Sequence, residues 1–272
     1  MTQDITYTGL ALGFLLMLIP IYIFNKYKVG LVGSTLSATA RMIIQMTLIG
    51  VYLRYLFKYD LWYINILWGL FMVAVASYTA VSRTSLKPSV LFIPIMASFF
   101  STALFVSLFF LILVLRIDAT LHVSLDLNVI FTARYFIPIF GLLLGNMLGV
   151  NVLSLTTYYE GIKREHNLYY FLLGNGATHE EATLPFIRPA IRKSFNPCIA
   201  NMAVMGIVAL PGTMIGQILG GSDPTTAVKY QLMIVVITFV ASIISLLITI
   251  RLANTKSFDA NGNLKDVFQK KA

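Results

Sequence analysis

The residues of this sequence that could bind a solute are amides and thioethers that interrupt long apolar segments. They are Asn146, Asn151, Asn201, Gln217, Met202, Met205 and Met214. Polar groups inside a membrane-spanning segment are costly and usually face the interior of a helix bundle, and thioethers are ligands for soft metal ions. Together these side chains could line a transport pathway. The alternative roles are hydrogen bonds between helices for each amide and gap filling for each methionine.

A second candidate feature is the dipeptide Pro211-Gly212, which should break the helix around it. Proline lacks the amide hydrogen and glycine lacks a Cβ, so the two together predict a kink or an unwound segment. A broken helix at membrane depth persists only where protein or a water-filled cavity satisfies the freed backbone groups. Residues 210–221 are therefore a candidate part of the pathway. The alternative is a proline kink that serves only close contact between helices.

We do not expect this chain to catalyse a reaction by itself. No Gly-x-x-x-x-Gly-Lys-Ser/Thr phosphate loop occurs, so any energy from ATP must arrive from another polypeptide. His179-Glu180 begins like a zinc-peptidase motif, but no histidine stands where the second metal ligand is required. We therefore predict a chain that is not an enzyme and holds no cofactor, and we assign no metal site.

A membrane-embedded helical bundle must hold these residues, because the composition excludes a soluble fold. Of 272 residues, 58% are hydrophobic and 11% are charged, whereas soluble domains have about 25% charged residues. A helix needs about 20 mainly apolar residues to cross a bilayer. We predict an all-α, polytopic transmembrane bundle of about seven spans, at residues 5–24, 36–57, 62–81, 90–115, 129–153, 200–219 and 227–252.

The distribution of lysine and arginine predicts the orientation of this bundle. With the N-terminus outside, the inner side holds 15 of the 20 basic residues and the outer side holds five. Basic residues collect on the cytoplasmic side of membrane proteins, so we predict an outside N-terminus and a cytoplasmic C-terminus. The net charge of +9 is then explained by topology, and we expect no nucleic-acid partner.

A long polar connection, residues 154–197, should lie in the cytoplasm. Apolar residues recur there at helical spacing, which predicts that the fifth span continues as an amphipathic helix and ends at Gly174. A second helix should open at Thr178, because Glu181 three residues later completes a capping box. Two prolines, at positions 185 and 189, should kink or shorten that helix.

The sequence predicts one domain and a C-terminal tail. Residues 1–253 form one transmembrane domain that includes the connection at about 154–197. Residues 254–272 are polar and rich in lysine, and we expect them to be a solvated or disordered cytoplasmic tail.

The segment from Gly176 to Arg192 is a short acidic and then basic helix between two spans. It resembles the coupling helix of ATP-binding-cassette permeases, in which a Glu-Ala pair docks into a groove on the ATPase subunit. The resemblance implies that contacts to an ATPase are made by Thr178, Glu180, Glu181 and Ala182. The alternative is an interfacial helix that lies on the lipid headgroups, with Arg188, Arg192 and Lys193 facing phosphates.

A longer block decides between families: Leu-Pro-Gly-Thr-Met-Ile-Gly-Gln-Ile-Leu-Gly-Gly at 210–221, followed by Asp223-Pro and Tyr230-Gln231. This block resembles the FetB-type family of permeases, whose bacterial members are named as iron exporters and whose plant relatives act in aluminium tolerance. The resemblance continues back through Gly-Ala-Thr-His-Glu-Glu-Ala at 176–182 to Gly-Leu-Leu-Leu-Gly-Asn at 141–146. The N-terminal half matches mainly in hydropathy and in the order of spans.

The resemblance implies that residues 1–253 are a permease domain in the bacterial plasma membrane. It would be one half of a homodimer that works with two copies of a separate ATP-binding-cassette ATPase, which binds the ATP. Export and iron are implied by the resemblance alone, since the spans hold no cluster of the carboxylates that hard ions prefer. The alternative is a secondary transporter or channel that runs without ATP, which would need titratable groups at the span centres, where no acid occurs.

Overall fold

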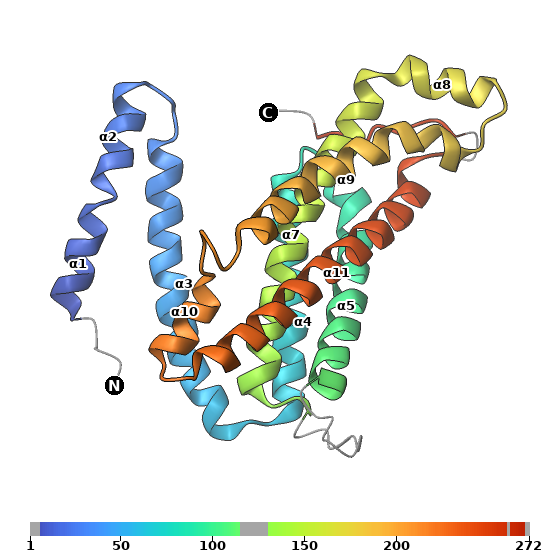
Figure 1. Ribbon diagram of the computed structural model, residues 1–272. Helices are drawn as coiled ribbons and strands as arrows, with labels where there is room; N and C mark the ends of the chain where they lie inside the picture. Colours follow the sequence, from blue (N-terminus) through green and yellow to red (C-terminus); the bar gives the residue numbers. More distant parts are fainter. Residues whose placement is uncertain (1–5, 115–129, 260–261, 270–272) are drawn as a thin grey trace.

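The computed structural model describes residues 6–114, 130–259 and 262–269, and these form helices and connecting loops (Figure 1). The helices are α1 (Tyr7–Leu15), α2 (Leu18–Lys26), α3 (Val32–Tyr59), α4 (Trp62–Arg83), α5 (Pro88–Phe109) with the π-helical η1 (Phe110–Val114), α7 (Ala133–Arg164), α8 (His166–Gly174), α9 (His179–Val204), α10 (Gly212–Leu219) and α11 (Pro224–Ser257). The predicted all-α, polytopic bundle is confirmed.

Six of the predicted spans are present as helical segments of 20 to 34 residues that are apolar enough to cross a membrane. In Figure 1, α1 starts at the end of the molecule where α10 and α11 meet, and α11 ends at the opposite end, beside α8. Termini at opposite ends are what an outside N-terminus and a cytoplasmic C-terminus require. Which end faces the cytoplasm stays a prediction.

The predicted span at 200–219 is different, because no continuous helix covers it. Helix α9 ends at Val204 and α10 begins at Gly212, so residues 205–211 leave the helical path. A tight turn satisfies part of the freed backbone, since the Gly206 amide donates to the Ala209 carbonyl at 2.9 Å. Gly206 has a φ of +87°, which a residue without a Cβ adopts at little cost. The predicted break is thus present, and it extends several residues before Pro211-Gly212.

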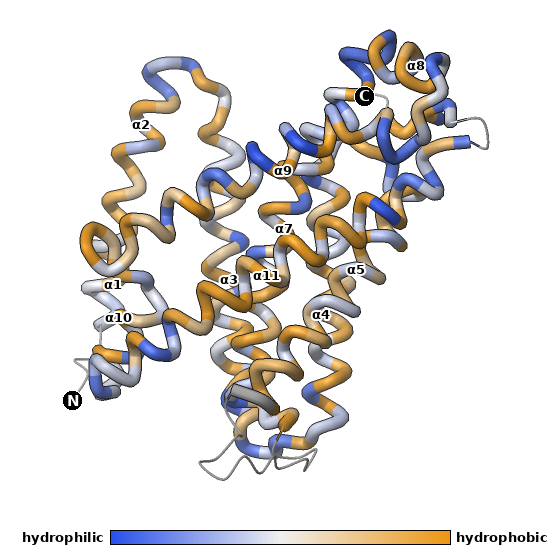
Figure 2. Tube along the Cα trace, turned by 45° about the vertical axis from the view of Figure 1, so that its right-hand side comes forward, coloured by the Kyte–Doolittle hydropathy of each residue, from blue (hydrophilic) through white to orange (hydrophobic). Residues whose placement is uncertain are grey.

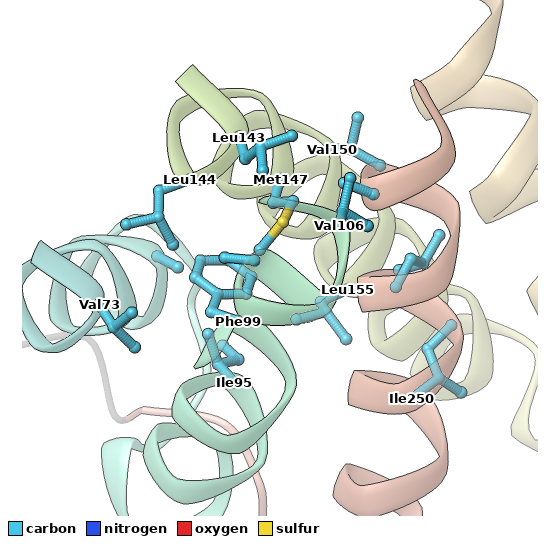
Figure 3. Close-up of a cluster of buried hydrophobic side chains, with 14 of the residues drawn as sticks. Val73, Ile95, Phe99, Val106, Leu143, Leu144, Met147, Val150, Leu155 and Ile250 are labelled. Carbon is cyan, nitrogen blue, oxygen red and sulfur yellow. The ribbon is translucent and has the colours of Figure 1, made fainter. Parts of the chain in front are cut away.

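The core of the bundle lies between α4, α5, α7 and α11. Residues of α7 that recur every three or four positions, among them Leu143, Met147 and Val150, are buried. Figure 3 shows Met147 beside Phe99 of α5 in this apolar cluster. These buried residues form an apolar stripe, and α7 packs against α4, α5, α9 and α11.

The first three helices stand apart from this core. No residue of the most apolar stretches of the α1–α2 segment and of α3 is buried, and Leu56 is the one buried residue of α3. Figure 2 shows hydrophobic residues along these helices and hydrophilic ones at the ends of the bundle, especially near α8. Such an outward apolar surface suits contact with lipid chains or with another transmembrane chain.

The connection 154–197 is more helical than predicted. The fifth span continues as helix α7 to Arg164 and not to Gly174, because the chain turns at Glu165 and a separate helix, α8, then ends at Gly174. Of the two predicted effects of proline, shortening does not occur, because α9 runs for 26 residues through Pro185, Pro189 and Pro197. All three prolines lie on the exposed side of α9. The hydrogen bonds that they remove are therefore lost away from the core.

The expectation of a solvated or disordered tail is wrong for the described residues 258–259 and 262–269. Phe258 and Val267 are buried, and the Lys87 amide donates to the Val267 carbonyl at 2.8 Å. Lys87 also forms an ion pair with Asp266, with 2.6 Å between Nζ and Oδ2. The tail therefore lies against the start of α5 and closes that end of the bundle.

Candidate functional site

A cavity of about 240 Å³ lies between α7, α9, α10 and α11, at the level where α9 ends. Its polar lining consists of Asn146, Cys198, Asn201, Thr213, Gln231, Thr238 and Ser242. None of the described residues that line it is charged. We call this space the transport cavity, because it is the place where the broken segment and the polar residues of three long helices meet.

Helix α10 closes one side of the transport cavity and rests on α11. The Thr213 hydroxyl donates a short hydrogen bond to the side-chain oxygen of Gln231, which is itself buried. After α10, Gly221 turns the chain with a φ of +93°, and Asp223 caps the start of α11 by accepting from the Thr226 amide at 3.2 Å. With eight residues, α10 is too short to cross a bilayer by itself, and it links the end of α9 to the start of α11.

Between the transport cavity and the α8 end, α7 is fixed to its neighbours by a series of buried hydrogen bonds. Asn151 donates to the Ser245 hydroxyl of α11 at 2.9 Å, and Ser154 donates to Ser194 of α9 at 2.5 Å. Nearer the end, the Tyr158 hydroxyl donates to the Asn254 side chain of α11 at 3.1 Å. These bonds hold α7, α9 and α11 together, so the helices should move as a unit over this length.

The predicted capping box at the start of α9 is confirmed. The Glu181 amide donates to the Thr178 hydroxyl at 3.3 Å, and the Glu181 carboxylate accepts from the Thr178 amide at 2.8 Å. The Thr178 hydroxyl also donates to the carboxylate, at 2.9 Å, and the two bonds from Thr178 hold the pKa of Glu181 below its usual range. Glu181 is thus occupied within the chain, whereas Glu180 is exposed and is not part of the box.

His179 ties this helix start to two other elements. The Tyr169 hydroxyl of α8 donates to the Gly262 carbonyl at 2.7 Å and lies 3.0 Å from His179 Nδ1. Since a phenol has one hydrogen, Nδ1 must carry the proton and donate to Tyr169. The His179 ring also contacts the Phe258 ring, with 4.4 Å between centroids. We call Tyr169, Thr178–Ala182, Phe258 and Gly262 the coupling corner.

A larger cavity, of about 750 Å³, opens beside the coupling corner between the start of α9 and the end of α11. Glu180 and Arg251 both line it. Another face of α9 is basic, because Arg188, Arg192 and Lys193 line a separate groove with Thr157 of α7. The cavity beside the coupling corner is therefore lined by both acidic and basic side chains, and the later turns of α9 carry a separate basic groove.

The sequence profile of the uncharacterised protein family UPF0014 matches residues 7–258. The chain belongs to the UPF0014 family. It is similar to Protein ALUMINUM SENSITIVE 3 of Arabidopsis thaliana, with 30% identity over 82% of this chain and 77% of that protein. It is also similar to the UPF0014 membrane protein YjkA of Bacillus subtilis, with 29% identity over 95% and 98% of the two chains.

A third UPF0014 relative is the probable iron export permease protein FetB of Escherichia coli, with 28% identity over 97% of this chain and 96% of that protein. The resemblance to the FetB-type family is thus confirmed. No solved structure matches. As a member of UPF0014 with six apolar helices long enough to cross a bilayer, the chain is a multi-pass membrane protein.

In this UPF0014 chain, part of the predicted pathway converges on the transport cavity: Asn146, Asn201, Met202 and Met205. Asn151 does not line it, because its amide donates to Ser245 and to the Met147 carbonyl, so hydrogen bonding between helices is its structural role. The remaining predicted residues, Pro211, Gly212, Met214 and Gln217, are not among the lining residues and belong to α10 or its first turn.

Of the predicted coupling residues, Ala182 lies differently from the expectation. It is fully buried within the chain, so its side chain cannot contact another polypeptide in this arrangement. Sequence reasoning also missed lining residues of the transport cavity, chiefly Cys198, Thr213 and Gln231. Cys198 could have been found, because it stands four residues before Met202, on the same face of a helix.

Proposed function

We propose that this chain is the permease subunit of an ATP-binding-cassette transporter and that a solute, a metal ion or another small molecule, crosses the membrane through the transport cavity. The observation that carries the proposal is that α9 and α11 line this cavity with one part of their length and meet at the coupling corner with another. The name of the relative FetB supports a permease, export and iron.

The mechanism follows from the length of α9 and from the hydrogen bond that holds α9 to α7. From Thr178 to Cys198 the helix covers about 30 Å at about 1.5 Å per residue. ATP binding on a separate ATPase subunit would favour one position of the coupling corner over another, and α9 with α11 would carry that shift to the cavity. The partner would be a phosphate-loop ATPase, and two permease chains with two ATPase chains would form the transporter in the bacterial plasma membrane, with the C-terminus inside.

The exposed apolar surface of α1–α3 supports a dimer of permease chains, because these helices bury little within their own chain. The competing function is a channel or secondary transporter. The uncharged lining of the transport cavity argues against proton or sodium coupling there, since such coupling uses titratable or carboxylate groups.

Purification of the tagged chain from native membranes tests the proposal. We expect a phosphate-loop ATPase to co-purify and to hydrolyse ATP. Glu180→Lys should remove most of the bound ATPase, because Glu180 is exposed at the coupling corner. The matched control is Glu160→Lys, the same charge change at an exposed position of α7. Equal ATPase recovery from all three proteins would overturn the assignment of the coupling corner.

A further inference from the structure

One wall of the transport cavity carries sulfur at three positions. Cys198, Met202 and Met205 all line it. The spacing of four residues places Cys198 and Met202 on one side of α9, and Met205 follows directly after the last residue of that helix. The Cys198 thiol is half-buried and lies 3.8 Å from the Ser194 carbonyl. A weak hydrogen bond of this kind orients the thiol and is easily replaced by a stronger ligand.

The opposite walls add neutral polar groups and no charge. Asn146, Gln231 and Thr238 contribute amides and a hydroxyl from α7 and α11. Within the described residues, no group of three or more histidine, cysteine, aspartate or glutamate side chains could hold a metal ion. A hard divalent ion would therefore find no carboxylate in the transport cavity, although carboxylates are the ligands that such ions prefer.

We infer that the transport cavity binds a soft monovalent metal ion, of the class of Cu(I) or Ag(I), through the sulfur atoms of Cys198, Met202 and Met205. This inference rests on the proposed function, because it names the class of solute that the cavity takes. Thiolate and thioether sulfur are the soft ligands that select such ions.

The charge balance favours a monovalent ion over a divalent one. When the ion binds, a sulfur–metal bond forms at Cys198, the S–H bond breaks, and the proton leaves to solvent. Each methionine donates a lone pair and no charge, and no electron is transferred. A monovalent ion thus replaces one proton, and the net charge of the cavity stays at zero. A divalent ion would leave one uncompensated positive charge inside the membrane region, which is costly.

Titration of the purified chain with Ag(I), without ATP or ATPase, tests the inference directly. We expect one ion bound per chain and one proton released per ion near neutral pH. Removing a group that merely orients a metal ligand typically costs about 10–100-fold in affinity. Cys198→Ser, Met202→Leu and Met205→Leu, which remove ligands themselves, should each weaken Ag(I) binding by at least about tenfold.

The matched control is Met214→Leu in α10, which lies near the transport cavity but does not line it. Its Ag(I) affinity should equal that of the unmodified chain, and the leucine substitutions conserve volume, so the variants should fold. Ag(I) binding that is unchanged in both Cys198→Ser and Met202→Leu would overturn the inference. Tighter binding of Fe(II) than of Ag(I) would overturn it as well. Neither result would alter ATPase co-purification, so failure here is distinguishable from failure of the proposed function.

Discussion

Replacement of Ala182 by leucine separates the two roles that the coupling corner could give this residue. The Ala182 side chain is fully buried at the start of α9. The three extra carbon atoms of leucine must therefore displace neighbouring side chains, such as that of Phe186 one turn further along the helix. Added volume in a filled interior typically costs about 1–3 kcal/mol. For a chain of this size, each kcal/mol shifts the unfolding temperature by about 2–4 °C, which predicts a decrease of about 2–12 °C.

The assay is thermal unfolding of the purified chain in detergent, followed by ATPase co-purification at matched expression. Glu180→Lys is the comparison, because Glu180 is exposed and its charge near a helix start contributes only about 0.3–1 kcal/mol. We expect Ala182→Leu to lower the unfolding temperature and Glu180→Lys to leave it almost unchanged. An unfolding temperature unchanged by Ala182→Leu, with loss of ATPase binding, would refute the reasoning and show that Ala182 is a docking contact.

Three further predictions concern topology, the broken helix and pH. A cysteine at the exposed position Glu165, in a Cys198-free background, should resist an impermeant reagent in intact cells; rapid labelling would reverse the predicted orientation. Alanine at both positions of Pro211-Gly212 should lower transport more than expression. Unchanged transport would mean that the break serves only the packing of helices. Burial lowers the pKa of His179 below its usual range, against a smaller opposing effect of its neighbour Glu180. A lowered pKa means that the stabilisation is complete above about pH 6.5 and is lost as the pH falls further. His179→Asn should therefore make the decline in unfolding temperature below that pH less steep, and the control His166→Asn should leave the decline as it is. Identical pH profiles of unfolding temperature for the two variants would contradict the burial argument.

The spans and the start of α9 could be predicted from the sequence, from its hydropathy and from a capping pattern. Six spans follow from runs of apolar residues, since a bilayer imposes a length of about 20 residues on each. The start of α9 follows from the spacing of Thr178 and Glu181, because both partners of the capping box are local in sequence. The N-terminal end of the break was harder to place, since residues 205–209 include helix formers and the turn depends on the positive φ of Gly206.

The transport cavity and the coupling corner depend on contacts between distant segments, which a single sequence does not contain. Asn201 and Gln231 meet because α9 and α11 lie against α7. Ala182 is small enough to suit either a buried contact or a docking surface, so its type alone could not decide its role. The buried tail was missed because its composition is polar overall, although it contains Phe258 and Val267, whose side chains are buried.

The central claim is that ATP hydrolysis on a separate subunit drives a solute through this chain by way of the coupling corner. The most direct test measures the accumulation of Ag(I) and Fe(II) in inside-out vesicles that contain the chain and its co-purifying ATPase. The account predicts accumulation of an ion with ATP, none with a non-hydrolysable analogue, and a large loss with Glu180→Lys. Equal accumulation with ATP, with the analogue and with Glu180→Lys would contradict it and would establish a transporter that runs without ATP.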